Sequence, residues 1–328
     1  MLKKITQFLG GLSAGPGVGG EPLAQLCLFG KHPGWDDHMQ DMGLTTDRLV
    51  EVRRLLYSEG IAGNIDSGAW EKLPARVERF DHAFLWRFRR DEFVYGRMWA
   101  SSDGRGRSKY PMIACVHARG LDPAKISARA AETVTRAMEG CRSERDAQSV
   151  RALFMRESEA LKAQASAMLS PPDERFDRIC RAGMAMDASA HPEHALGLER
   201  VAYALHREAE PAIKKESTHI SRGVHLRARR MEGLGVGGSA WAWSAASLDL
   251  LGRPQGLDEG MLAIEAVEGG WVDLLFGRVS ATELFCLKAP LTAVPLTSDV
   301  PFSIPAEFAD RVRSRVGLWR QNEGGRAG

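Results

Sequence analysis

Residues 26–41, which read LCLFGKHPGWDDHMQD, hold the densest group of side chains that could bind a metal ion. Imidazole and carboxylate groups at this density, here His32, Asp36, Asp37, His38 and Asp41, could hold a divalent transition metal. The spacing matches no established metal motif, however, and adjacent ligands on one turn rarely converge without partners elsewhere. Capping of the next segment by Asp36 or Asp37 needs one carboxylate and local backbone amides, so we favour capping. A metal-dependent hydrolase that uses His32, Asp36, Asp37 and His38 remains the alternative.

A second charged segment, residues 101–109, contains Asp103, Arg105, Arg107 and Lys109 between two apolar runs. Its glycines allow backbone amides to converge, and its arginines supply bidentate donors, so the loop could bind an anion. An internal ion pair with Asp103 or with an aspartate of the first stretch would use the same residues. Both interpretations stay open.

Apolar strands must position both segments. Leu26–Phe29 is a four-residue apolar run that Gly30 ends. Arg97–Ala100 precedes the second loop and Tyr110–Val116 follows it, and both runs are typical of strands. We predict that residues 30–37 and residues 101–109 lie side by side at one end of a sheet.

Within that pair of loops, we expect Arg107 to face Asp36 or Asp37, directly or through one water molecule. A loop held by rigid strands is a common place for function.

These residues resemble the TagF/ImpM family of type VI secretion accessory proteins. The family's first block is an aromatic residue, Gly-Lys-x-Pro and then an aspartate, matched here by Phe29, Gly30, Lys31, His32 and Pro33 with Asp36 or Asp37. Its second block is matched by Ser101, Asp103, Gly106, Arg107, Tyr110 and Pro111. Gly104 stands where the family has arginine, with Arg105 one place later, and one extra residue separates Arg107 from Pro111. The resemblance covers roughly residues 26–120, and the chain resembles a divergent member of the family.

The resemblance implies a bacterial, cytoplasmic accessory or regulatory adaptor that acts by protein–protein interaction in a type VI secretion or similar system. Its expected partners are components or regulators of the apparatus. The family has no established catalytic chemistry, so we expect no enzyme activity, cofactor or metal. The expected interaction residues are Gly30, Lys31, Pro33, Asp36, Asp37, Ser101, Asp103, Arg105, Gly106, Arg107 and Pro111.

Composition is consistent with this class. The formal net charge is +2, from 44 basic and 42 acidic residues, which argues against a broad nucleic-acid surface. The five cysteines are scattered without a CxxC motif, as in proteins of a reducing compartment. The longest late stretch without charge, residues 233–248, is shorter than the roughly 20 residues that a spanning helix needs. We therefore expect a cytoplasmic protein with no membrane span.

A dinucleotide-type spacing occurs at Gly233, Gly235 and Gly238. No long βαβ context surrounds it, so a flexible loop is the preferred interpretation. Ser102 and Ser239 lie near glycines, but neither lies in the Gly-x-Ser-x-Gly elbow of hydrolases.

The order of elements predicts an α/β (α+β) fold with a mainly antiparallel sheet, packed helices and a large helical segment in the middle of the chain. We expect a hairpin around residues 90–92 and another around residues 268–270. Residues 60–74 read mostly as loop, and residues 143–169 as one long helix. The expected division is a flexible tail at 1–22, a TagF-like domain at 23–121, a helical segment at 122–215 and a C-terminal α/β part at 216–328.

Overall fold

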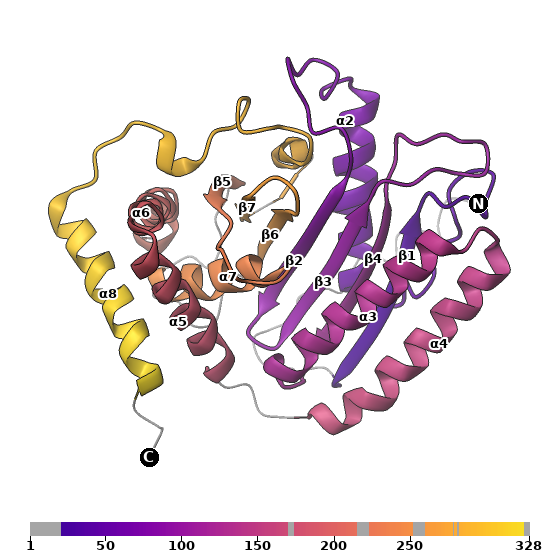
Figure 1. Ribbon diagram of the computed structural model, residues 1–328, viewed down its shortest axis with the longest axis horizontal. Helices are drawn as coiled ribbons and strands as arrows, with labels where there is room; N and C mark the ends of the chain where they lie inside the picture. The colour runs from indigo at the N-terminus through magenta and orange to yellow at the C-terminus, as the bar shows by residue number, and fades with distance from the viewer. Residues whose placement is uncertain are drawn as a thin grey trace, which may run out of the picture.

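The computed structural model describes residues 21–169, 174–214, 223–251, 260–277, 279–280 and 282–324. Within these residues, one seven-stranded antiparallel sheet in the order β1-β4-β3-β2-β6-β7-β5 is covered by helices on both faces (Figure 1). The expected antiparallel α+β fold is confirmed. The predicted flexible tail lies outside the described residues, apart from Glu21 and Pro22.

Most strands match an apolar run of the sequence, whereas β5 alternates apolar residues with histidine and arginine. The strands are β1 (Leu23–Gly30), β2 (Asp81–Arg89), β3 (Glu92–Trp99), β4 (Met112–Arg119), β5 (Val224–Arg229), β6 (Met261–Ala266) and β7 (Trp271–Phe276). The two predicted hairpins join β2 to β3 and β6 to β7. All residues of β3, β6 and β7 are buried, because helices cover both faces of the sheet. This explains why these strands lack the alternation of half-exposed antiparallel strands.

The first face is covered by one continuous helical segment: α1 (Asp47–Val52), a π-helix η1 (Arg53–Ile61) and α2 (Ala62–Asp66). Thr46 caps this segment, since its side chain accepts a hydrogen bond from the backbone N–H of Leu49. The expectation that loop begins at Gly60 is wrong. A Cβ on Gly60 would lie 2.3 Å from Leu284 Cδ1, so this glycine allows the close approach of the 3₁₀ helix η3 (Glu283–Leu287).

The second face carries α3 (Pro123–Ser143) and α4 (Ala147–Ala165) over β1, β3 and β4. Over the other strands lie α6 (Pro192–Lys214) and α7 (Gly238–Leu250), while α5 (Arg175–Ala190) and α8 (Ala306–Gly324) form an outer layer (Figure 1). Short 3₁₀ turns η2 (Ser166–Met168) and η4 (Thr297–Asp299) complete the described helices. The helix predicted at residues 143–169 starts later, because Asp146 caps α4 at the backbones of Gln148 and Ser149.

The sheet is continuous from the N-terminal to the C-terminal part of the chain, since β2 pairs with β6 in a register that places Phe84 opposite Ile264. The four-part division of the chain stays a prediction. No helix of the described residues is long and apolar enough to cross a membrane.

Candidate functional site

The two charged loops meet at one end of the sheet, as predicted. Gly30 at the end of β1 and Trp99 at the end of β3 both pair with Met112 at the start of β4. Backbone hydrogen bonds then join the loops directly: Gly104 N donates to the Trp35 carbonyl at 2.7 Å, and Lys31 N donates to the Pro111 carbonyl at 3.1 Å. The first turn and the second loop therefore form one surface.

The carboxylate of Asp103 is the centre of this surface. It accepts hydrogen bonds from Lys31 Nζ at 2.6 Å and from Arg107 Nε at 2.7 Å. It also accepts the backbone N–H groups of Arg105 at 3.1 Å and of Arg107 at 2.9 Å. Burial raises the pKa of Asp103, but the hydrogen bonds from Lys31 and Arg107 outweigh burial and hold that pKa well below its usual range.

An outer ring of charge surrounds this centre. Arg107 donates to the Asp36 carbonyl at 2.7 Å and lies 3.2 Å from an Asp37 carboxylate oxygen, so the predicted contact between the loops is confirmed. Lys31 Nζ also donates to Asp37 at 2.6 Å, which lowers the pKa of Asp37. Arg105 Nη2 lies 3.6 Å from Asp36 Oδ2, and both side chains are exposed.

Glycines allow the loops to come this close. Gly30 has φ +121°, and a Cβ there would lie 2.4 Å from the Pro111 carbonyl oxygen. Gly106 has φ +77° and donates its N–H to the Asp103 carbonyl at 2.9 Å. A Cβ on Gly104 would lie 3.0 Å from the Pro33 carbonyl oxygen, which is a tight contact. Ser101 begins the loop and is half-buried.

Sequence reasoning missed an aromatic group beside the loops. The His38 ring lies 5.1 Å from the Tyr110 ring and 5.8 Å from the Tyr57 ring, in edge-to-face geometry. Tyr57 projects from the π-helix η1 and donates to the Pro111 carbonyl at 3.4 Å. Burial raises the pKa of Tyr57, which keeps it a neutral donor. The one sequence signal that could have placed Tyr57 beside the loops is its position in the predicted helical segment.

The metal-binding alternative used His32 together with Asp36, Asp37 and His38, and the structure gives both nitrogens of the His32 ring a backbone partner. Nε2 lies 2.9 Å from the Cys141 carbonyl, and Nδ1 accepts the Gly34 N–H at 2.9 Å. Burial lowers the pKa of His32. The ring therefore anchors the first turn to the end of α3.

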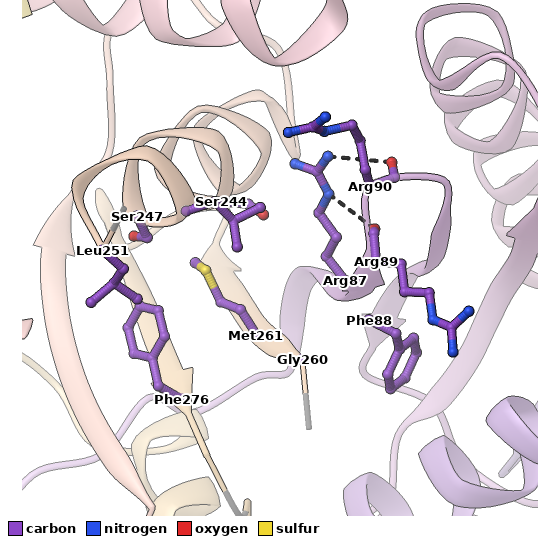
Figure 2. Close-up of a pocket in the computed structure, with 11 residues that line it drawn as sticks. Arg87, Phe88, Arg89, Arg90, Ser244, Ser247, Leu251, Gly260, Met261 and Phe276 are labelled. Carbon is purple, nitrogen blue, oxygen red and sulfur yellow. Dashed lines mark hydrogen bonds between the residues drawn. The ribbon is translucent and has the colours of Figure 1, made fainter. Parts of the chain in front are cut away.

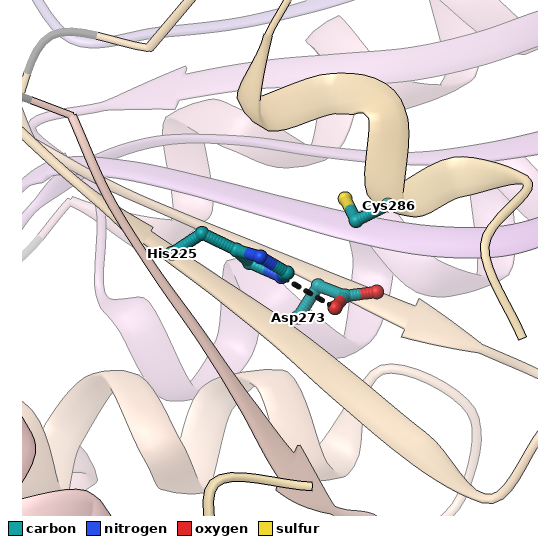
Figure 3. Close-up of side chains that lie close together, drawn as sticks. All are labelled: His225, Asp273 and Cys286. Carbon is teal, nitrogen blue, oxygen red and sulfur yellow. Dashed lines mark hydrogen bonds and ion pairs between the residues drawn. The ribbon is translucent and has the colours of Figure 1, made fainter. Parts of the chain in front are cut away.

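One group of three potential ligands in the described residues has its ligand atoms within 4.8 Å of one another: His225, Asp273 and Cys286 (Figure 3). His225 Nε2 lies 2.7 Å from Asp273 Oδ1, while Arg227 donates to both Asp273 oxygens at 2.6 and 3.1 Å. Trp271 Nε1 donates to the same carboxylate at 3.1 Å. Four donors saturate Asp273, and burial raises the pKa of the Cys286 thiol, so this group is a closed hydrogen-bond network and a poor metal site.

The Gly233-x-Gly235-x-x-Gly238 segment does follow a strand and open a helix, α7. Its anion position is filled by the chain itself, because Glu265 Oε2 accepts the Gly237 N–H at 3.1 Å. Gly237 has φ +84°, and a Cβ there would lie 2.6 Å from the Tyr95 ring. A carboxylate of the chain therefore already binds a backbone N–H group at the N-terminus of α7.

At the opposite end of the sheet, a shallow pocket is lined by the end of β2, the end of α7 and the strands β6 and β7 (Figure 2). Apolar groups such as Met261 and Phe276 form its floor. Arg87, its most buried cation, donates to the carbonyls of Arg89 and Arg90 and forms an ion pair with Asp177 at 2.8 Å. The polar atoms of Arg87 are thus engaged within the chain.

No protein-family model and no curated protein matches the chain. A solved structure, the crystal structure of PA0076 from Pseudomonas aeruginosa PAO1, is similar with 20% sequence identity and a TM-score of 0.26. The alignment covers 45% of this chain and 64% of that chain, which is less than two thirds of its length. Likeness at this level carries no argument about shared function.

Proposed function

We propose that this protein is a non-enzymatic cytoplasmic accessory or regulatory adaptor that binds other proteins through the paired loops 30–37 and 101–109. The sequence resemblance to the TagF/ImpM family supports a type VI secretion or similar apparatus as its setting. The observation that carries the proposal is that a buried Lys31–Asp103 pair fixes an exposed set of charged side chains.

The exposed set has the properties of a protein-recognition surface. The side chains of Asp36, Arg105 and Arg107 are 80%, 66% and 51% exposed, so they can reach a partner. Their backbones are held by the buried pair, which reduces the entropy lost on binding. Charges of both signs in a fixed pattern favour specificity and fast association. The neighbouring Tyr110 and His38 add aromatic groups of the kind enriched at interfaces.

A charge reversal at the rim tests the proposal. Arg105→Glu should abolish co-purification with components of the apparatus and impair secretion, while the melting temperature stays that of the parent protein. Arg76→Glu is the matched control, because Arg76 is an exposed arginine that lies 3.7 Å from an exposed carboxylate, Glu78, much as Arg105 lies beside Asp36. Normal partner binding and secretion by Arg105→Glu would refute the assignment of this surface.

A further inference from the structure

The first of the paired loops lies against the start of α4, so the surface that the loops form continues beyond them. A Cβ on Gly34 would lie 2.7 Å from the backbone nitrogen of Ala147, the first residue of α4. His32 holds the same turn to the end of α3, since its ring lies 2.9 Å from the Cys141 carbonyl. Side chains of the α3–α4 connection and of the first turns of α4 therefore border the paired loops.

Trp35 lies at this border and is half-buried. Its backbone carbonyl accepts the Gly104 N–H of the second loop, and part of its ring packs against the core. The ring meets the His32 ring edge to face, with 5.4 Å between centroids. The guanidinium carbon of Arg151, from α4, lies 5.8 Å from the Trp35 ring centroid. A tryptophan that its neighbours hold in place while part of it stays accessible is the kind of side chain that anchors protein interfaces.

Cations without a carboxylate partner surround this tryptophan. Arg145 and Arg151 are exposed, and neither has an ion pair within the part of the chain that the structure describes. Burial lowers the pKa of His32, and the nearby charge of Arg145 lowers it further, which places that charge beside the first turn. Arg142 is also exposed, and the half-buried Glu144 offsets one of the three positive charges. The border of the loops therefore has an excess of positive charge.

The aspartates of the same surface, in contrast, are engaged within the chain. Asp36 lies beside Arg105, and Asp37 accepts a hydrogen bond from Lys31. Asp146 caps α4, where it accepts two backbone N–H groups of the first turn at 2.9 Å each. The charge that remains without a partner is positive, so the complementary surface of a partner is acidic.

The exposed aspartates also decide what kind of anion this border fits. Asp36 and Asp37 are 80% and 66% exposed, and they lie within the same surface as the cations. A nucleic acid or an anionic lipid surface has charge of one sign, so it would bring phosphates up to these carboxylates. A protein segment has individual charges at defined positions and can meet the cations while it avoids the aspartates. The mixed pattern therefore favours a protein.

We propose that the docking surface of the paired loops continues over Trp35 onto the start of α4, and that this extension binds an acidic protein segment. Carboxylates of the segment pair with Arg145 and Arg151, and an apolar side chain of the segment packs on the exposed part of the Trp35 ring. This inference rests on the proposed function, because it names the chemistry of the partner that the paired loops bind.

The test uses the full chain and overlapping peptides that tile the sequences of the apparatus components, with dissociation constants from fluorescence anisotropy. The peptides that bind should be rich in aspartate and glutamate, and their asparagine and glutamine versions should not bind. Arg145→Glu and Arg151→Glu should each weaken binding about tenfold or more at an unchanged melting temperature, because like charges then meet. Trp35→Ala should weaken binding about 30-fold, which corresponds to the roughly 2 kcal/mol of a hot-spot residue. That variant also loses packing against the core, so the two exposed arginines decide the test.

Arg178→Glu is the matched control, since it makes the same change of charge elsewhere on the surface. Arg178 is exposed on α5 and, like Arg151, has no ion pair among the described residues. Helix α5 lies away from the start of α4 (Figure 1). Arg178→Glu should bind the acidic peptides as the parent protein does.

Several results would overturn the inference: no bound peptide, bound peptides without carboxylates, unchanged binding in Arg145→Glu or Arg151→Glu, or an equal loss in Arg178→Glu. Tighter binding of the parent protein to random-sequence single-stranded DNA or to anionic vesicles than to any peptide would also overturn it. Co-purification with the apparatus separates this inference from the proposed function. If Arg105→Glu loses co-purification while Arg145→Glu and Arg151→Glu keep it, only the extension onto α4 fails. If all three variants keep it, the proposed function fails as well.

Discussion

Replacement of Lys31 by methionine tests whether the buried ion pair holds the paired loops in a fixed conformation. The Lys31 side chain is 4% exposed and the Asp103 side chain 0%, and the two are joined at 2.6 Å. Methionine keeps most of the length and apolar bulk of lysine, so the change removes the charge and its hydrogen bonds with little change of packing. The perturbation is therefore electrostatic.

The expected magnitude follows from what remains around Asp103. Removing one partner of a buried pair costs about 3–5 kcal/mol when the other charge is left without compensation. Here Arg107 Nε and two backbone N–H groups still bind the carboxylate. We therefore expect Lys31→Met to lower the free energy of unfolding by about 2–3 kcal/mol, below the range for a lone charge.

A graded series of variants in urea denaturation checks this reasoning. Arg107→Ala should cost about 1 kcal/mol, because its side chain is half exposed and water screens its ion pairs. Arg105→Ala should cost less than about 0.5 kcal/mol, since both members of its pair are exposed. If Lys31→Met destabilises no more than Arg105→Ala, the buried pair does not hold the loops together and the reasoning fails.

Three further changes test other parts of the structure. Arg227→Met should lower the free energy of unfolding by about 3–5 kcal/mol near pH 8. Without Arg227, burial raises the pKa of Asp273, so the folded variant takes up a proton and the loss of stability becomes smaller as pH falls. Denaturation at pH 8 and at pH 5 measures this difference. Gly60→Ala should cost about 1–3 kcal/mol by overpacking against Leu284, and Leu284→Ala in the same chain should recover part of it, which a double-mutant cycle would show. Asp103→Gly should lower the melting temperature. Added acetate should then raise the melting temperature of the variant by more than it raises that of the parent protein.

The part of the fold set by local patterns could be predicted from the sequence. Asp122 and Pro123 mark the start of α3, and its buried stripe has helical spacing. The turn between β2 and β3 follows from charged residues between two apolar runs. The juxtaposition of the two loops could be predicted because each follows or precedes a strand that ends at the same edge.

What the sequence could not reveal depends on contacts between distant segments. Glycine at position 60 suggests a break in the helix, whereas the real reason for it is a side chain more than two hundred residues away, Leu284. The burial of Arg227 is similarly non-local. Its guanidinium donates to the carbonyls of Cys286, Ala289 and Val294 and so holds this irregular segment in place. Nothing in the sequence of β5 indicates these partners.

The same distant contacts decide how the glycine-rich loops should be interpreted. The loop at residues 101–109 and the loop at residues 233–238 both have the features of an anion site, namely backbone N–H groups and nearby cations. In each of them a carboxylate of the chain occupies the anion position. Asp103 does so locally, four residues before Arg107. Glu265 does so from another strand, where Gly237 N and the Arg230 side chain, 3.1 Å away, surround it. A carboxylate that is covalently part of the chain competes at very high effective concentration, so a free phosphate would have to displace it. These two loops are therefore better suited to holding a fixed shape than to binding a small anion. A fixed shape is the property that a docking surface requires.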